Sequence, residues 1–240
     1  MSGITIFKYA LRRGLMKPAS LVANCVLPLG LIIFMRDGFA MQGAYEGGGT
    51  SGFFMLAFLL MFGAFMMAGG IQADKQDGVT VRILAGPVTF RSYLIQNFFA
   101  GLVPMVVLLL VISGLGLALH GWELPFAAGV LLCYTLLSAT MIGLSFVWAV
   151  LFKDKEASLV AFTLVVMLMG LVGGLMIPQE IMPAVLRNLG AVFPPHWAAR
   201  GLTALTADGA LFTTQYWVSM GALALFAIAL LLFGSKRRIA

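Results

Sequence analysis

The chain is divided by long apolar runs, each of which could cross a lipid bilayer, with short polar segments between them. An α-helix crosses the hydrocarbon core of a bilayer with about 20 residues. We therefore predict six transmembrane spans, at residues 19–35, 52–73, 92–119, 125–152, 158–177 and 216–234. The third and fourth are longer than a bilayer requires, so we expect them to tilt or to extend past the headgroups.

Composition indicates the class of protein. Hydrophobic residues make up 61% of the 240 residues, and charged residues only 10%. A soluble domain carries about 25% charged residues, so this chain could not cover its surface with polar groups. The apolar runs lack the alternation of barrel strands, and lipid cannot satisfy an open backbone. The sequence therefore predicts an all-α integral membrane protein with one transmembrane domain over residues 1–240.

The basic residues indicate how the spans are oriented. Twelve of the 15 Lys and Arg fall before the first span, between the second and third, between the fourth and fifth, or after the sixth. Because basic residues favour the cytoplasmic side, both termini are predicted to be cytoplasmic, in a multi-pass protein of the cell (inner or plasma) membrane. The net charge of +6 fits anionic inner-leaflet lipid and needs no nucleic acid partner.

The N-terminal segment, residues 2–17, has the pattern of an amphipathic helix. Ile4, Phe7 and Leu11 recur at helical spacing, and Lys8 lies on a neighbouring face. A basic amphipathic helix of this kind lies on the cytoplasmic leaflet of the membrane. No small-residue cleavage site follows the basic start, so we expect the segment to be retained. The alternative is an ordinary positive flank of the first span.

Two polar segments are too long for simple turns. Residues 74–91, on the predicted cytoplasmic side, have room for a short helix whose apolar positions could face a soluble partner. Residues 178–212, on the predicted outer side, carry prolines that punctuate two short helices, expected at 184–192 and 197–207. A loop with helices of its own is rarely slack. We therefore expect the outer segment to cap whatever passes through the membrane.

The sequence contains no motif for reaction chemistry. It has no phosphate-binding loop, no zinc pattern, no nucleophile motif and no paired carboxylates at catalytic spacing, so we expect no catalytic residue, no metal site and no enzyme activity. Cys25 and Cys133 fall inside spans and are interpreted as packing residues, and His120 and His196 as loop or interface residues. An ion-coupled carrier normally keeps ionisable groups inside the bilayer, and the predicted spans hold almost none.

The polar segment between the second and third predicted spans carries a recognisable pattern. After Asp74 it reads Gly78-Val79-x-x-x-Ile83-Leu84-Ala85-Gly86-Pro87-Val88-Thr89. This resembles the coupling segment of type-2 ABC exporter permeases, the family with ABCG-like (type V) structures, in which an acidic residue precedes G-T-x-x-x-L-L-x-T-P-[VI]-[ST]. Val79 and Gly86 stand where that family usually has threonine.

A second pattern lies at the end of the fifth predicted span. Gly174 is followed by Pro178, Glu180 and Pro183, with the spacing G-x-x-x-P-x-E-x-x-P. A proline–aromatic stretch comes next, with Pro194, Pro195, His196 and Trp197. Both resemble the outer segment of the same permeases, so the resemblance extends over nearly the whole chain.

The resemblance implies a separate ABC ATPase subunit, which binds Mg-ATP, and no cofactor in this chain. Val79, Ile83 and Leu84 would then lie in a groove on the ATPase, as in helix-in-groove recognition. The charged residues Asp74, Asp77 and Arg82 would set the orientation at the rim. Gly78 and Pro87 complete the residues assigned to coupling. The family architecture also implies a second permease copy, with a homodimer favoured over a heterodimer. A solvated linker without a partner is the alternative for this segment.

The side chains of the spans constrain the substrate. An apolar pathway with a few hydroxyl groups suits an amphipathic or lipid-like molecule moved outward, such as a drug, a peptide or a glycolipid. Candidate pathway residues are Asn24, Phe58, Phe62, Phe65, Met66 and Thr163. The alternative for each of them is packing or contact with membrane lipid. For the whole chain, the alternatives are a non-transporting membrane binding or assembly protein and, less favoured, an ion-coupled carrier.

Overall fold

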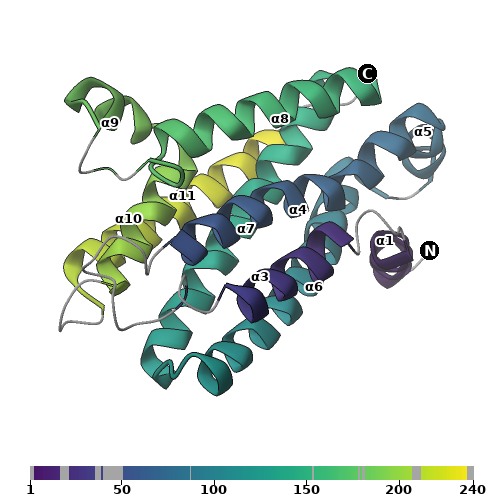
Figure 1. The fold of residues 1–240 in the computed structure, drawn as a ribbon. Helices are drawn as coiled ribbons and strands as arrows, with labels where there is room; N and C mark the ends of the chain where they lie inside the picture. The colour runs from purple at the N-terminus through teal and green to yellow at the C-terminus, as the bar shows by residue number, and fades with distance from the viewer. Residues whose placement is uncertain are drawn as a thin grey trace.

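The computed structural model describes residues 3–16, 22–35, 39, 51–86, 88–152, 154–177, 179, 182–206 and 212–236. Across these residues every regular element is helical (Figure 1). In chain order the elements are α1 (Gly3–Met16), the π-helix η1 (Val22–Val26), α3 (Leu27–Phe34), α4 (Ser51–Gln76), α5 (Val79–Leu84), α6 (Phe90–Leu119), α7 (Leu124–Leu151), α8 (Lys155–Val172), α9 (Ala184–Gly190), α10 (Pro194–Thr206) and α11 (Thr214–Lys236). The predicted all-α fold is confirmed for this part of the chain.

Several of these helices have the length and composition of membrane spans. Those long and apolar enough to cross a membrane are Phe90–Leu119, Leu124–Ala149 and Thr214–Gly234. Shorter apolar helical stretches coincide with the other predicted spans, at Asn24–Phe34, Gly52–Met66 and Glu156–Val172. The chain is therefore a membrane protein, and crossing by all six segments stays a prediction.

The first predicted span begins as a π-helical turn, η1, and becomes α-helical in α3. Pro28 occupies the first turn of α3, where its missing N–H is not needed. Asn24 of η1 is buried, and a Cβ atom at Gly63 of α4 would overlap its Oδ1. The glycine therefore lets η1 and α4 approach closely, as small residues do between helices in membranes.

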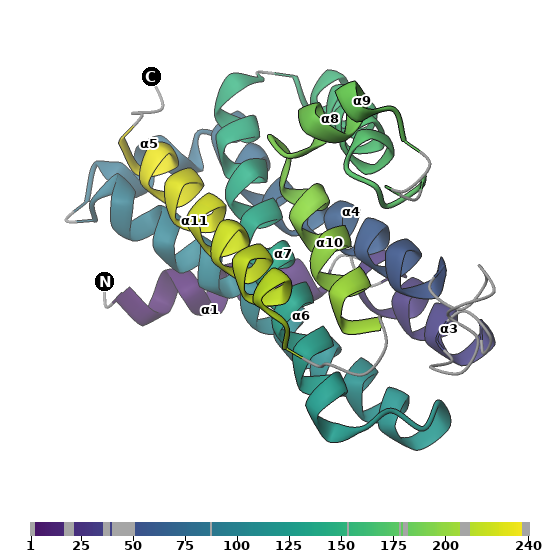
Figure 2. The same ribbon diagram turned by 90° about the vertical axis from the view of Figure 1, so that its left-hand side faces the viewer.

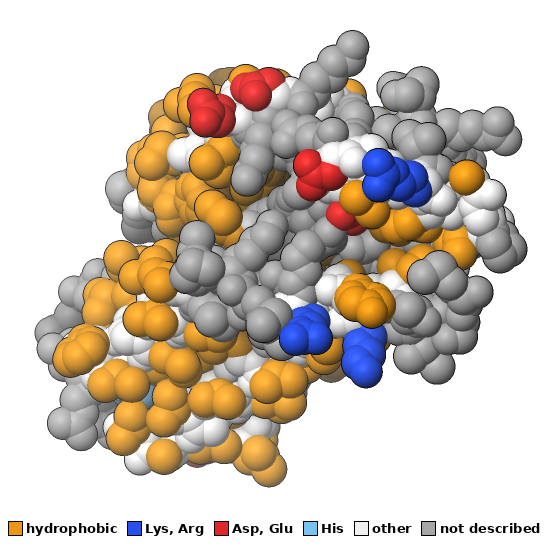
Figure 3. All heavy atoms as spheres, turned by 90° about the vertical axis from the view of Figure 1, so that its right-hand side faces the viewer, with side chains coloured by type: hydrophobic (Ala, Val, Ile, Leu, Met, Phe, Trp, Pro, Cys, Tyr) orange, Lys and Arg blue, Asp and Glu red, His pale blue; other side chains and the backbone are white. Residues whose placement is uncertain are grey.

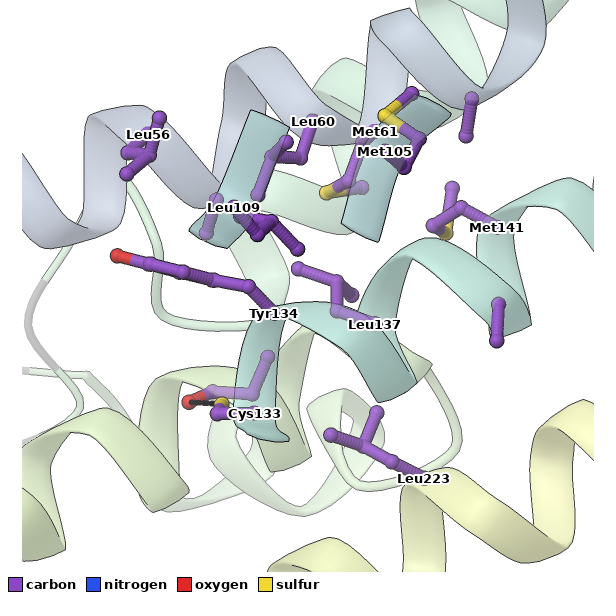
Figure 4. Close-up of a cluster of buried hydrophobic side chains, with 14 of the residues drawn as sticks. Leu56, Leu60, Met61, Met105, Leu109, Cys133, Tyr134, Leu137, Met141 and Leu223 are labelled. Atoms are coloured by element: carbon purple, nitrogen blue, oxygen red, sulfur yellow. Dashed lines mark hydrogen bonds between the residues drawn. The ribbon is translucent and has the colours of Figure 1, made fainter. Parts of the chain in front are cut away.

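Helix α7 is the centre of the bundle. It packs against α4, α6, α10 and α11 (Figures 1 and 2). Figure 4 shows side chains of α4, α6, α7 and α11 meeting in one apolar cluster. The buried small and hydroxyl residues of α7 include Ser138, Ala139, Thr140, Gly143 and Ser145. Such residues allow close approach of backbones, which stabilises helix pairs in lipid through dispersion contacts.

Side chains of α7 also donate hydrogen bonds to backbone carbonyls of its neighbours. The Tyr134 hydroxyl donates to Phe53 O of α4 at 2.9 Å. The Thr140 hydroxyl donates to Leu223 O of α11 at 3.1 Å. Both donors are buried, and a buried donor left without its acceptor costs about 1–3 kcal/mol. These bonds therefore fix the positions of α4 and α11 along α7.

The two ends of the bundle carry different sets of charges. Helices α1 and α5 and the end of α11 lie at one end, named here the α5 end, and α9 lies at the other, named the α9 end (Figures 1 and 2). Figure 3 looks at the α5 end and shows acidic and basic side chains among large apolar areas. The charged residues at this end whose side chains are described are Lys8, Arg12, Asp74, Asp77, Arg82, Arg91, Asp154 and Glu156. Those at the α9 end are Glu123, Arg187 and Arg200.

An aromatic cluster holds the α6–α7 connection against α4 at the α9 end. Trp122 stacks on Phe53, with the ring centroids 5.4 Å apart. Its Nε1–H donates to Phe39 O at 3.0 Å. Gly116 of α6 lies beneath the indole, so closely that a Cβ atom there would overlap the ring. The position of Trp122 therefore depends on a glycine at residue 116.

We expect Gly116→Ala to lower the thermal stability, because the added methyl group would push Trp122 away from Phe53. Overpacking of this kind costs about 1–3 kcal/mol. Gly114→Ala is the matched control, since no atom lies within 4 Å of a Cβ atom there and alanine favours a helix. Thermal unfolding of the detergent-purified variants measures the difference. Equal melting temperatures for the two variants would contradict this role of Gly116.

Candidate functional site

The segment between α4 and α6 contains a short helix, α5. Helix α4 continues to Gln76, and the chain then turns at Asp77 and Gly78 before α5 begins. Gly78 has a φ of 67°, a left-handed conformation that glycine adopts without strain. The Arg82 amide donates to Gly78 O at 3.3 Å and closes the first turn of α5. Helix α5 therefore lies between the end of α4 and the start of α6 (Figure 1).

The side chains of α5 and its turn divide between the bundle and the surface. Thr80 is buried, and Ile83 is half-buried and packs against the apolar core. Val79 is also half-buried, whereas Asp77 and Arg82 are exposed. The predicted apolar face is therefore partly used inside the subunit. The two charged residues are therefore accessible to a partner outside the subunit.

Some predicted site residues lie outside the described residues. These are Pro87 of the coupling segment and Pro178 and Glu180 of the outer segment. The backbone of Leu84 ends α5, but its side chain is likewise outside the description. Their roles stay as predicted from the sequence.

Asp74 lies inside the bundle. Its Oδ2 accepts a hydrogen bond from the Tyr93 hydroxyl of α6 at 2.6 Å. Only 7% of the Asp74 surface and 1% of the Tyr93 surface are exposed. This corrects the expectation that Asp74 stands at the rim of the coupling segment. The reason is that α4 stays helical beyond Asp74, which shares a helix face with the buried Ile71 three residues earlier.

At the α9 end, α8, α9 and α10 meet in a junction around His196, which is buried in the first turn of α10. Gln179 lies between α8 and α10. Its Nε2 donates to Gly173 O at 3.2 Å and lies 3.4 Å from His196 Nδ1. The Trp197 indole N–H donates to Ala191 O at 2.9 Å, which ties the end of α9 to α10. The structure thus brings residues of the second sequence pattern together.

Two predicted prolines begin the short helices of this junction. Pro183 precedes α9 and is exposed, and Pro194 opens α10 and is buried. Helix α10 begins three residues earlier than predicted, because proline suits the first turn of a helix. Sequence reasoning did not single out Gln179, although its place between the proline and the acid of the outer pattern was a signal.

The candidate pathway residues do not share one environment. Phe65 is buried and stacks on Phe162 of α8, with the ring centroids 4.0 Å apart. Asn24 is buried against α4. The half-buried candidates are Phe58, Phe62, Met66 and Thr163. Phe65 and Asn24 therefore contribute to packing within the subunit, and contact of the others with a substrate stays a prediction.

The cysteines and the potential metal ligands contribute no further site. Cys133 is buried, and its Sγ lies 3.7 Å from Ala198 O of α10 (Figure 4). Cys25 is half-buried, and both thiols are free. Within the described ranges, no three His, Cys, Asp or Glu side chains are arranged to hold a metal ion. Two candidate sites remain. One is the exposed pair of Asp77, in the turn before α5, and Arg82 of α5, named here the tip of α5. The other is the buried junction around His196.

We expect the His196 junction to lose stability in acid. Burial, and then the charge of Arg200, lower the pKa of His196 from its ordinary value of 6.5. The unfolded chain therefore binds this proton more readily, so the stabilising contribution is complete above pH 6.5 and declines as the pH falls below that value. The melting temperature of the wild type should fall more, between about pH 7.5 and about pH 5.5, than that of His196→Gln. Equal pH dependence in both proteins would contradict this assignment.

The chain also matches known proteins. Residues 37–236 match the family described as "ABC-2 family transporter protein". The linearmycin resistance permease protein LnrN of Bacillus subtilis (strain 168) is 31% identical over 169 residues, which cover 68% of this chain and 42% of that protein. The match thus spans about two fifths of the length of this curated relative. The family match covers more than half of the chain, which therefore belongs to the ABC-2 family and is a transmembrane permease subunit of an ABC transporter.

Proposed function

We propose that this chain is the membrane half of an ATP-driven exporter and that α5 contacts a separate ATPase subunit. The observation that carries the proposal is the tip of α5, where Asp77 and Arg82 are exposed between the ends of α4 and α6. Membership of the ABC-2 family supports it, because permease subunits of this family in general work with an ATPase partner. That partner would bind Mg-ATP and supply the energy for movement.

The α5 end faces the cytoplasm in this arrangement. The basic residues of the chain are concentrated in the segments that meet there, as the positive-inside rule requires. Helix α1 packs beside α6, and its Lys8 and Arg12 are exposed where anionic headgroups would meet them. All six apolar segments would then cross the cell membrane, with both termini in the cytoplasm and the α9 end outside.

Recognition at α5 combines charge with a small apolar contact. Asp77 and Arg82 would orient the ATPase, because exposed charges at a rim determine orientation and association rate more than affinity. The half-buried Val79 and Ile83 would add apolar contact area. Closure of the ATPase would displace α5 and, through it, α4 and α6. Two permease copies, in our proposal identical, would enclose the pathway between them.

The proposed substrate is an amphipathic or lipid-like molecule that is moved outward. The half-buried Phe58, Phe62 and Met66 of α4 offer an apolar surface that adapts to different shapes. The relative in Bacillus subtilis is named for resistance to linearmycin, which supports export of a small molecule. A drug, a peptide or a glycolipid would each suit this chemistry.

We expect Arg82→Glu to release the ATPase subunit. The tagged chain would be co-expressed with a candidate ABC ATPase subunit from the same organism, purified in detergent, and assayed for retained ATPase. Charge reversal at the exposed tip should reduce retention at least about tenfold, because like charges placed across an interface cost more than about 1.4 kcal/mol.

Arg187→Glu is the matched control, because it reverses an exposed arginine of another short helix, at the α9 end. This variant should retain as much ATPase as the wild type. If Arg82→Glu retains as much as Arg187→Glu, the contact at α5 is wrong. If the wild type itself retains none, a membrane assembly protein that does no transport becomes the better description.

A further inference from the structure

A buried hydrogen bond closes the chain around α5. Asp74 belongs to the last turn of α4, and Tyr93 belongs to the first turn of α6. The Tyr93 hydroxyl donates to Asp74 Oδ2 at 2.6 Å, across a separation of 19 residues. The bond therefore joins the two ends of the loop that carries α5. This loop includes the residues that the proposed function places against the ATPase.

The bond is of a strong kind. A hydroxyl that donates to a carboxylate forms a short bond, roughly twice as strong as a bond between neutral groups. Both side chains are buried, and a low local dielectric strengthens the attraction further. Separating the two groups would leave buried polar atoms without this contact, which is costly. The pair is therefore suited to resist a pull between α4 and α6.

Tyr93 is in turn held in place by the first turns of α6. The Phe90 ring stacks beside it, with the centroids 6.4 Å apart. The Asn97 side-chain amide donates to Tyr93 O at 2.9 Å. Thr89 caps the helix by accepting a hydrogen bond from the Ser92 amide at 3.3 Å. A displacement that reaches Asp74 is therefore passed to the start of α6 as a whole.

Two turns flank α5 within this loop. Gly78 connects α4 to α5 with a positive φ, and the exposed Ala85 and Gly86 follow α5 on the other side. Among the described side chains of α5, the buried Thr80 and the half-buried Ile83 lie against the bundle. A pull on α5 therefore reaches the membrane through the two ends of this loop, which the bond between Asp74 and Tyr93 holds together.

We propose that Asp74 and Tyr93 are positioning residues that make the end of α4 and the start of α6 move together when the ATPase displaces α5. The inference rests on the proposed function and adds the contact by which movement enters the membrane. If the pair only stabilised the fold, removal of the bond would lower the stability of the chain without a specific loss of ATP-dependent movement at the α9 end. If the pair has the positioning role, removal of the bond leaves ATP hydrolysis unchanged and reduces the movement of the α9 end.

The test follows the far end of the bundle in the complex with the ATPase. Val185 of α9 has 70% of its surface exposed and becomes the reporter as Val185→Cys, in a chain whose Cys25 and Cys133 are replaced by alanine. The complex is reconstituted in lipid nanodiscs. The rate of maleimide labelling is measured with and without Mg-ATP, together with ATPase retention and the rate of ATP hydrolysis.

Tyr93→Phe removes the donor hydroxyl and leaves the ring. We expect it to retain the ATPase and its hydrolysis rate, while the ATP-dependent change in labelling shrinks at least about fivefold. Asp74→Asn keeps an acceptor oxygen but removes the charge, so its response should lie between those of the wild type and Tyr93→Phe. Tyr134→Phe is the matched control, since this buried tyrosine also loses one hydroxyl bond, to Phe53 O. It should lose stability and keep the full response.

The outcomes separate the inference from the proposed function. A full response in Tyr93→Phe and Asp74→Asn, or an equal loss in Tyr134→Phe, would overturn the positioning role and leave the ATPase contact standing. A wild-type complex that retains no ATPase, or shows no ATP-dependent labelling, would overturn the proposed function and the inference with it.

Discussion

Close approach of helix backbones around α7 is the interaction on which the rest of this structure depends. Lipid cannot hydrogen-bond an open backbone and gives helices little hydrophobic reason to associate. The small and hydroxyl side chains of α7 bring α4, α6 and α11 near enough for dispersion contacts. Tyr134 and Thr140 add buried bonds to neighbouring backbones. Glycines have the same effect elsewhere, where Gly63 makes room for Asn24 and Gly116 for Trp122.

The short helices α5, α9 and α10 lie at the two ends of the bundle. Short helices form few backbone hydrogen bonds of their own, so both ends depend on side chains to hold them. At the α5 end, the buried pair of Asp74 and Tyr93 closes the loop that carries α5. At the α9 end, the Gln179 side chain donates to Gly173 O and His196 O, and the Trp197 indole N–H donates to Ala191 O. At both ends, side-chain hydrogen bonds therefore hold the segments around the short helices in place.

The coupling segment illustrates how far sequence reasoning reaches. The polar interruption between two apolar runs predicts a short helix, and α5 is that helix. The same reasoning placed Asp74 at an exposed rim, because a charged residue at the end of an apolar run looks like the start of a loop. It also placed Ile83 in a groove on a partner, and the structure adds that part of this side chain packs against the core. His120 lies in the connection after α6, as interpreted from the sequence, and its Nε2 is 2.8 Å from Ile32 O.

The sequence by itself determined the membrane class, the all-helical fold and the family. These depend on local quantities: the length of an apolar run against the thickness of a bilayer, and short patterns around glycine and proline. Only the tertiary structure decided which polar side chains turn inward, because that depends on where a helix ends and which residues far along the chain come to face it. The contact between Asp74 and Tyr93, the overlap avoided at Gly116 and the place of Gln179 beside His196 are all of this second kind.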